Sequence, residues 1–168
     1  MAWPMNYTEY PRPVAQIDPT ACWAASLEWW LTCMNPKRSP ARQIDLISRY
    51  VRYWDARMEI NGKENKDYGT VSAVNFVKMI SQPEISMEYL LCTVPDLQVI
   101  RQKLSQSPVI IAYYEPKVKG SHVNVIHSTN LDHSLGDINV MEPNQGRFES
   151  KDVRRFTTKQ CLLGWAKQ

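Results

Sequence analysis

Cys22 has neighbours suited to nucleophilic chemistry. Gln16 precedes it on the same segment, and Trp23, Ala24 and Ala25 follow it in an apolar stretch that predicts a helix. A helix N-terminus favours a thiolate, and its first backbone N–H groups have no acceptor within the helix. The N–H of Cys22 and the side-chain amide of Gln16 could therefore hold the negative oxygen of a tetrahedral intermediate. We expect a nucleophile and an oxyanion hole within this segment.

The alternative interpretation of Cys22 is a small buried apolar residue, which is the usual state of a free cysteine. Cys33, Cys92 and Cys161 lie in apolar patterns without comparable neighbours, so we expect that state for them. The four cysteines contain no Cys-x-x-Cys pair, which argues against a zinc site and against a disulfide framework. We therefore expect free thiols in a reducing compartment, no metal and no cofactor.

A cysteine nucleophile needs a base, and the chain has three histidines. His122 follows Gly120-Ser121 and begins a predicted strand, so its ring can project from the rim of a sheet toward the start of the helix. His127 lies in the middle of the same strand and His133 lies in a turn, where packed or solvated rings are expected. We therefore predict that His122 is the general base.

The base must itself be oriented through its second ring nitrogen. Glu142 ends the strand predicted to lie beside the one that His122 begins, which brings its carboxylate back alongside the ring. Glu142 is the predicted orienting residue, and Asn144 is the competing one. The alternative for Glu142 is a solvated carboxylate on an edge strand.

Helical patterns dominate the first half of the chain, after an extended, proline-rich arm over residues 1–19. The first helix is expected to cross the core with Thr20 or Asp18 as its cap, and a polar loop is expected to follow the second helix. The predicted elements are a helix from Ala21 to Met34, a helix from Ser39-Pro40 to Met58, a loop over Asn61–Gly69 and a helix over Thr70–Ile80.

Strand patterns dominate the second half. We expect strands at Ser86–Cys92 and Pro108–Tyr114 around a helix at Pro95–Ser105, then a hairpin of Val123–Thr129 and Asp137–Met141 with its turn at Asp132–Gly136. Helices followed by a sheet, without a linker or repeat, predict one α+β domain over residues 1–168.

Charge and hydropathy exclude several functions. Twenty Lys and Arg residues against seventeen Asp and Glu residues leave a formal charge of +3, without a basic block that would bind nucleic acid. The chain has no apolar run of about 18 residues and no recognisable signal peptide, so we expect a soluble protein without membrane insertion, exported, if at all, by another route.

The order of Gln16, Cys22-Trp23-Ala24-Ala25, His122 and Glu142 resembles the papain-like cysteine proteases. Within them it is similar to the compact bacterial branch that includes double-glycine leader peptidases and secreted effector proteases. The resemblance runs from Gln16 to Gly146. That branch typically has Asp-Pro-x-x-Gly at the orienting residue, whereas this chain has Glu142-Pro143-Asn144-Gln145-Gly146.

The resemblance implies a papain-like fold in which the nucleophile helix packs on a C-terminal antiparallel sheet. It also implies a cysteine endopeptidase with a Cys22–His122–Glu142 triad, a Gln16 oxyanion donor and a protein or peptide substrate. Loop Asn61–Gly69 and Gly120-Ser121 would form walls of its cleft.

The resemblance further suggests a secreted bacterial toxin or effector that acts on target-cell proteins in a reducing cytoplasm. A cognate immunity protein or inhibitor would restrain it in the producing cell. Two other functions remain open. One is a peptidoglycan amidase toxin, although such enzymes usually have Asp-Cys-Ser where this chain has Ala21-Cys22-Trp23. The other is a non-catalytic papain-like binding module, which would tolerate replacement of Cys22.

Overall fold

The computed structural model describes residues 3–36, 41–54, 57–60, 63–69, 71–117, 120–130, 136–157 and 159–168. Their helices are α1 (Cys22–Met34), α2 (Gln43–Arg49), α3 (Ala73–Ile80) and α4 (Leu97–Leu104). Their strands are β1 (Arg57–Ile60), β2 (Lys63–Gly69), β3 (Met87–Cys92), β4 (Val109–Glu115), β5 (Gly120–Thr129), β6 (Ile138–Glu142), β7 (Arg147–Lys151) and β8 (Cys161–Ala166). Within these ranges no helix is long and apolar enough to span a bilayer.

Helix α1 crosses the core, as predicted, and most of its side chains are buried. Its expected caps are wrong. The residue that precedes the helix is Ala21, which makes no side-chain capping bond. The Asp18 carboxylate instead accepts a hydrogen bond from the backbone N–H of Thr20 at 2.7 Å, and Thr20 precedes Ala21 and lies outside the helix. The N-terminus of α1 therefore begins without a side-chain acceptor of its own.

The second predicted helix is too long. Helix α2 ends at Arg49 and is followed by a 3₁₀ turn at Val51–Tyr53. Val51, which the prediction placed on the buried face of the helix, is exposed. The predicted cap at Ser39-Pro40 lies outside the described residues. The N-terminal arm also contains a 3₁₀ turn at Tyr7–Glu9, so it is not extended throughout.

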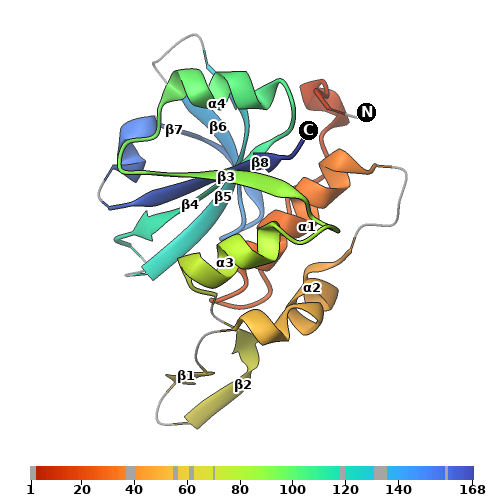
Figure 1. Ribbon diagram of the computed structural model, residues 1–168, viewed down its shortest axis with the longest axis vertical. Helices are drawn as coiled ribbons and strands as arrows, with labels where there is room; N and C mark the ends of the chain where they lie inside the picture. The colour runs from red at the N-terminus through yellow and green to blue at the C-terminus, as the bar shows by residue number, and fades with distance from the viewer. Residues whose placement is uncertain are drawn as a thin grey trace.

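The polar loop predicted over Asn61–Gly69 is mostly a strand. Strands β1 and β2 pair antiparallel, with Ile60 opposite Lys63. The sequence between those two residues is Asn61-Gly62, a dipeptide typical of two-residue hairpin turns, and this signal could have predicted the pairing. Figure 1 shows that the β1–β2 pair projects away from the main sheet.

The main sheet of the described residues has the order β3-β8-β4-β5-β6-β7, and its neighbouring strands are antiparallel. The predicted strands correspond to β3, β4, β5 and β6, and the predicted turn at Asp132–Gly136 lies largely outside the described residues. Strands β7 and β8 were not predicted from the sequence. Strand β8 lies between β3 and β4, so the C-terminal segment joins the edge strand β3 to the rest of the sheet (Figure 1).

Side chains alternate between the two faces of the sheet, as strand geometry requires. Val123 and Val125 of β5 belong to an apolar cluster that also includes buried residues of α1, α2 and α3. Ile126 packs in the cluster on the opposite face, together with Ile100 of α4. The sheet thus separates two apolar layers, which buries both of its faces.

Two buried hydrogen bonds fix α1 along the sheet. The Ser26 hydroxyl donates to the Val123 carbonyl at 3.3 Å, and the Trp30 indole N–H donates to the Pro108 carbonyl at 2.9 Å. Ser26 lies one helical turn after Cys22, and Val123 is adjacent to His122. The start of α1 is therefore held beside the start of β5.

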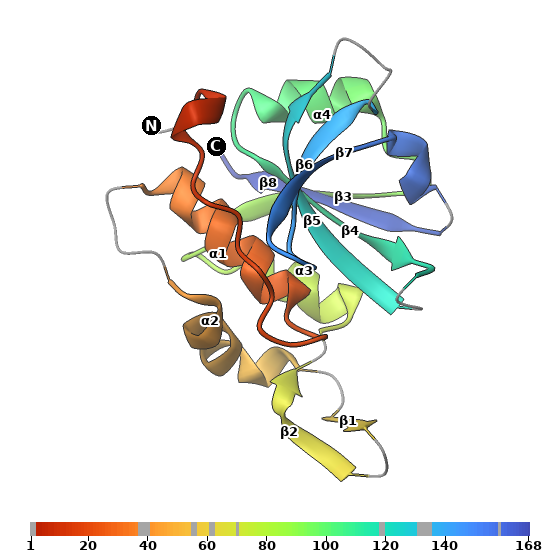
Figure 2. The same cartoon turned by 180° about the vertical axis from the view of Figure 1, so that it is seen from behind.

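The N-terminal arm is attached on both sides of Gln16. The backbone N–H of Gln16 donates to the Pro143 carbonyl at 2.8 Å. The buried Gln43 side chain accepts the Ile17 N–H at 2.9 Å and donates to the Ala15 carbonyl at 2.7 Å. Figure 2 shows the arm running beside α1 before it turns into the helix.

Gly146 allows the arm to approach the turn after β6. Its φ is +62°, and a Cβ on this residue would lie 2.6 Å from the Ala15 backbone nitrogen. Gly146→Ala should therefore destabilise the fold by about 1–3 kcal/mol, because it combines a disfavoured φ with a backbone clash. Urea denaturation of the purified chain measures this change.

The matched control is Gly164→Ala, where a Cβ would meet its nearest neighbour, Ile80 Cδ1, at 3.4 Å. Equal unfolding midpoints for the two alanine variants would contradict the close approach of the arm.

Candidate active site

Cys22 is the first residue of α1, and only 7% of its surface is exposed. The first backbone N–H groups of a helix have no acceptor within it, so the Cys22 N–H is oriented toward the space before the helix. The positive end of the helix dipole lies at the same place and stabilises negative charge there. The start of a helix is therefore a place where a thiolate or an oxyanion can be stabilised.

The buried His122 ring contacts both Cys22 and Glu142. Its Nε2 lies 2.6 Å from Glu142 Oε1, which leaves Nδ1 for the hydrogen bond with the Cys22 side chain. Burial by itself disfavours the charged ring. The hydrogen bonds and negative charges of Cys22 and Glu142 outweigh burial and raise the pKa of His122 to about 9.

The buried Glu142 carboxylate is surrounded by donors. Besides His122, it accepts from Lys151 Nζ at 2.6 Å, from Asn124 Nδ2 at 3.0 Å and from the Asn144 backbone N–H at 2.9 Å. Burial opposes ionisation of this carboxyl. The hydrogen bonds and positive charges of His122 and Lys151 nevertheless hold its pKa well below the usual range.

Lys151, like Asn124, belongs to this site although no sequence pattern predicted it. Its ammonium group is buried, and besides Glu142 it contacts Asn124 Oδ1 at 2.8 Å, Tyr113 Oη at 3.5 Å and Glu149 Oε2 at 3.5 Å. A lysine almost never lies fully buried unless its charge is paired. The only sequence signal is its position at the end of a short strand whose pattern was not recognised.

The Gln16 side chain lies at the turn that leads into α1. Its Nε2 donates to the Asp18 carbonyl at 2.9 Å, and the same carbonyl accepts the Ala21 backbone N–H at 3.2 Å. A primary amide has two N–H groups, so one remains for a substrate oxygen when the other is bound to Asp18. The Gln16 amide therefore lies at the Asp18–Ala21 turn, which leads into Cys22.

The competing candidates have other environments. The Asn144 side chain is exposed, and this residue supports Glu142 through its backbone N–H. His127 lies among four aromatic rings whose centroids are 4.8 to 6.4 Å from its own, and burial lowers its pKa to about 4. Those rings belong to Tyr7, Tyr10, Trp29 and Phe148. His133 lies outside the described residues.

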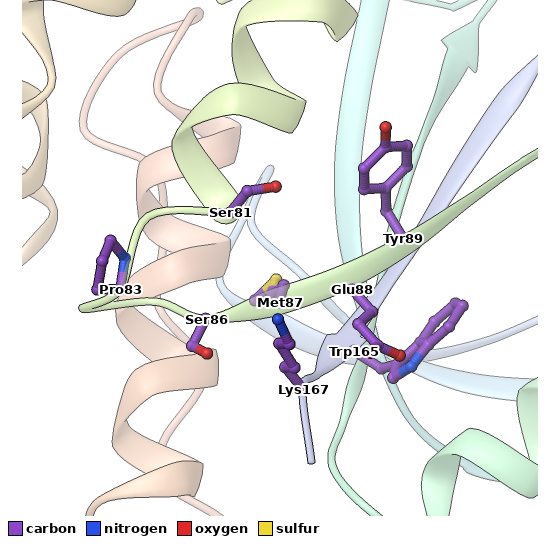
Figure 3. Close-up of a pocket in the computed structure, with 8 residues that line it drawn as sticks. All are labelled: Ser81, Pro83, Ser86, Met87, Glu88, Tyr89, Trp165 and Lys167. Carbon is purple, nitrogen blue, oxygen red and sulfur yellow. The ribbon is translucent and has the colours of Figure 1, made fainter.

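No group of three or more His, Cys, Asp or Glu side chains in the described ranges is arranged to hold a metal ion. Figure 3 shows a pocket between the end of α3 and the start of β3. Its lining residues are Ser81, Pro83, Ser86, Met87, Glu88, Tyr89, Trp165 and Lys167. None of them is a predicted site residue, so the candidate site remains at the start of α1.

The arrangement of thiol, imidazole and carboxylate is suited to acyl transfer. The imidazole can carry a proton between the sulfur and a leaving group while the carboxylate holds the ring and stabilises its charge. A backbone N–H at the start of a helix, such as that of Cys22, can stabilise an oxyanion.

The sequence matches no protein-family model and no curated protein. The structure is similar to the peptidase domain of Streptococcus ComA, a bi-functional ABC transporter involved in a quorum-sensing pathway, with a TM-score of 0.54. This similarity covers 93% of the chain and 98% of that domain, at 15% sequence identity. The fold is therefore the α+β, papain-like arrangement that the sequence predicted.

The protonation of His122 provides a direct test of this geometry. In an NMR titration the His122 ring should lose its proton near pH 9 and the His127 ring near pH 4. Because its pKa is raised, protonated His122 contributes stability that is fully present below the ordinary histidine pKa and disappears as the pH rises through about 9. In Cys22→Ala, the His122 midpoint should fall, since the strongest interaction raising it is removed. An unchanged His122 titration midpoint in this variant would contradict the contact between the Cys22 and His122 side chains.

The buried Lys151–Glu142 ion pair generates a second prediction. Lys151→Met should destabilise the fold by about 3–5 kcal/mol, because Glu142 then loses the nearest cation to its Oε2. The control is Lys78→Met, which removes an exposed lysine. Denaturant midpoints that are equal for the two variants would show that Lys151 does not stabilise the buried carboxylate.

Proposed function

We propose that this chain is a cysteine endopeptidase, with Cys22 as nucleophile, His122 as acid and base, and Glu142 as the residue that orients His122. The observation that carries this proposal is the buried, hydrogen-bonded series of Cys22, His122 and Glu142 at the N-terminus of a core helix. The similarity of the fold to a peptidase domain supports it.

The proposed reaction begins with the Cys22 thiolate and the protonated His122 ring. The sulfur attacks the peptide carbonyl carbon, and the carbonyl oxygen becomes negative. His122 then transfers its proton to the amine as the C–N bond breaks, which leaves an acyl group on the sulfur. Water, deprotonated by His122, attacks this thioester and releases the acid.

The electrostatics favour the ring as an acid in the first half of this cycle. With a pKa raised to about 9, the His122 ring carries its proton at neutral pH and can give it to a leaving amine. Glu142 stays ionised beside it and compensates that charge. Lys151 is a positioning residue in this scheme, because it contacts Glu142 and not the ring.

The oxyanion would be held by the Cys22 N–H and the Gln16 amide. One such donor contributes on the order of 3 kcal/mol of transition-state stabilisation in comparable sites. The hydrogen bonds of the arm to Pro143 and Gln43 hold Gln16 at the helix start. The arm would therefore contribute to catalysis as well as to folding.

We extend the proposal to the biological setting that the family resemblance implies. The enzyme would be a bacterial toxin or effector, delivered by a secretion system, that cleaves target-cell proteins in a reducing cytoplasm. A cognate immunity protein would restrain it in the producing cell by covering the Cys22 site. Failure of the neighbouring gene products to bind the chain or inhibit its cleavage would refute the restraint.

Cys22→Ala should abolish proteolysis without unfolding the chain, because the substitution removes little volume. We would incubate the wild type and this variant with a proteome and sequence the new N-termini. The control is Cys33→Ala, which also removes a buried thiol and should retain activity.

Three outcomes discriminate among the functions. New N-termini that depend on Cys22 support the peptidase, and their flanking residues give the cleavage preference. Cleavage of muropeptides instead of proteins indicates the amidase. Full biological activity of Cys22→Ala indicates a binding module.

A further inference from the structure

Cys92 and Cys161 form a pair that the proposed reaction does not use. Cys92 is the last residue of β3, Cys161 is the first residue of β8, and the two are direct cross-strand partners. Their sulfur atoms are 3.1 Å apart, although the residues are 69 positions apart in the chain. Both are free thiols in this structure.

We propose that Cys92 and Cys161 are a redox modification site, at which the two thiols close to a reversible cross-strand disulfide. This proposal does not depend on the peptidase activity. It predicts an intramolecular disulfide in an oxidising compartment and two free thiols in a reducing one.

The geometry requires only a small movement. Directly opposed residues of antiparallel strands have Cβ atoms about 4.5–5.5 Å apart. A disulfide needs about 3.5–4.5 Å. The pair stands at the end of the β3–β8 ladder, and β3 is the edge strand of the sheet. An edge strand can adjust at its end without disturbing strands on both sides.

The two sulfurs differ in access. Cys92 is partly exposed, whereas Cys161 is buried among apolar side chains of the layer that contains α4. Burial, assisted by the hydrogen bond with Cys92, raises the pKa of Cys161 to about 12. Cys92 is therefore the sulfur that an external reagent meets first, and Cys161 is the one that completes the bond.

The reaction balances with a small-molecule disulfide as oxidant, for which oxidised glutathione is the probe. Cys92 attacks one of its sulfurs and forms a mixed disulfide, which releases one glutathione thiol. The Cys161 sulfur then attacks Cys92 and releases the second glutathione thiol. In total, two protein thiols lose two electrons and two protons, and one glutathione disulfide becomes two thiols.

The remaining cysteines lack these features. Cys33 is fully buried, and burial raises its pKa far above the usual range. Cys22 contacts His122, whereas the close sulfur–sulfur contact in the described residues joins Cys92 to Cys161. Selective bonding of one pair among four cysteines is thus expected.

The bond would fasten the edge of the sheet. It would tie β3 to β8 at one end of their ladder, whereas the pocket of Figure 3 lies at the other end, where Met87 and Trp165 line it. Because the bond would also close a long loop of the unfolded chain, it should raise the resistance of the protein to denaturant.

The test uses the folded Cys22→Ala/Cys33→Ala chain, in which only Cys92 and Cys161 remain. The protein is equilibrated with glutathione buffers of increasing oxidation and then alkylated. Both thiols should disappear together, the mass should fall by two hydrogen atoms, and non-reducing peptide mapping should recover the Cys92–Cys161 link. The urea midpoint should rise on oxidation and return on reduction.

The control adds Cys92→Ser, which should leave one unmodified thiol and no shift of the urea midpoint. Two free thiols in the most oxidising buffer, a lasting glutathione adduct on Cys92, or a bond between two molecules would each overturn the proposal. If the double alanine variant does not fold, the same peptide mapping is applied to the wild-type chain, where a link from Cys92 to any cysteine other than Cys161 would overturn it.

Discussion

The burial of the ionised Glu142 carboxylate constrains the rest of the structure. Removing a carboxylate from water costs several kcal/mol, and only close donors and cations can offset that cost. Here His122 and Asn124 of β5, Lys151 of β7 and the Asn144 backbone N–H in the turn after β6 supply them. Strands β5, β6 and β7 must therefore keep their register, because a slip of one residue would turn these side chains to the other face.

The same constraint connects the sheet to the N-terminal half. Ser26 holds α1 against β5, and the arm is bound to the segment that follows Glu142 through the Gln16–Pro143 hydrogen bond and the close approach of Gly146. The thiol, the amide donor and the carboxylate are thereby positioned by segments that pack on each other directly. This arrangement explains why an extended arm, which has little secondary structure of its own, can present a side chain at a fixed place.

The sequence alone determined the features that depend on local pattern. The apolar run after Cys22 identified a core helix, strand patterns identified β3 to β6, and the strand positions of His122 and Glu142 predicted that they would meet. Such signals are strong because helix and strand periodicity are properties of neighbouring residues. The α+β, papain-like fold followed from the order of these elements and from the resemblance carried by a few motif residues.

Only the tertiary structure decided several other contacts between distant residues. Lys151 looks like an ordinary surface lysine until β7 pairs with β6. The pairing places it opposite Ile138, from where its side chain reaches Glu142. Gln43 likewise gives no sign that it holds the arm. The pairing of Cys92 with Cys161 likewise depends on β8 inserting beside β3. These contacts join residues far apart in the chain. Their free energy comes from desolvation and pairing inside the folded protein, which no local pattern encodes.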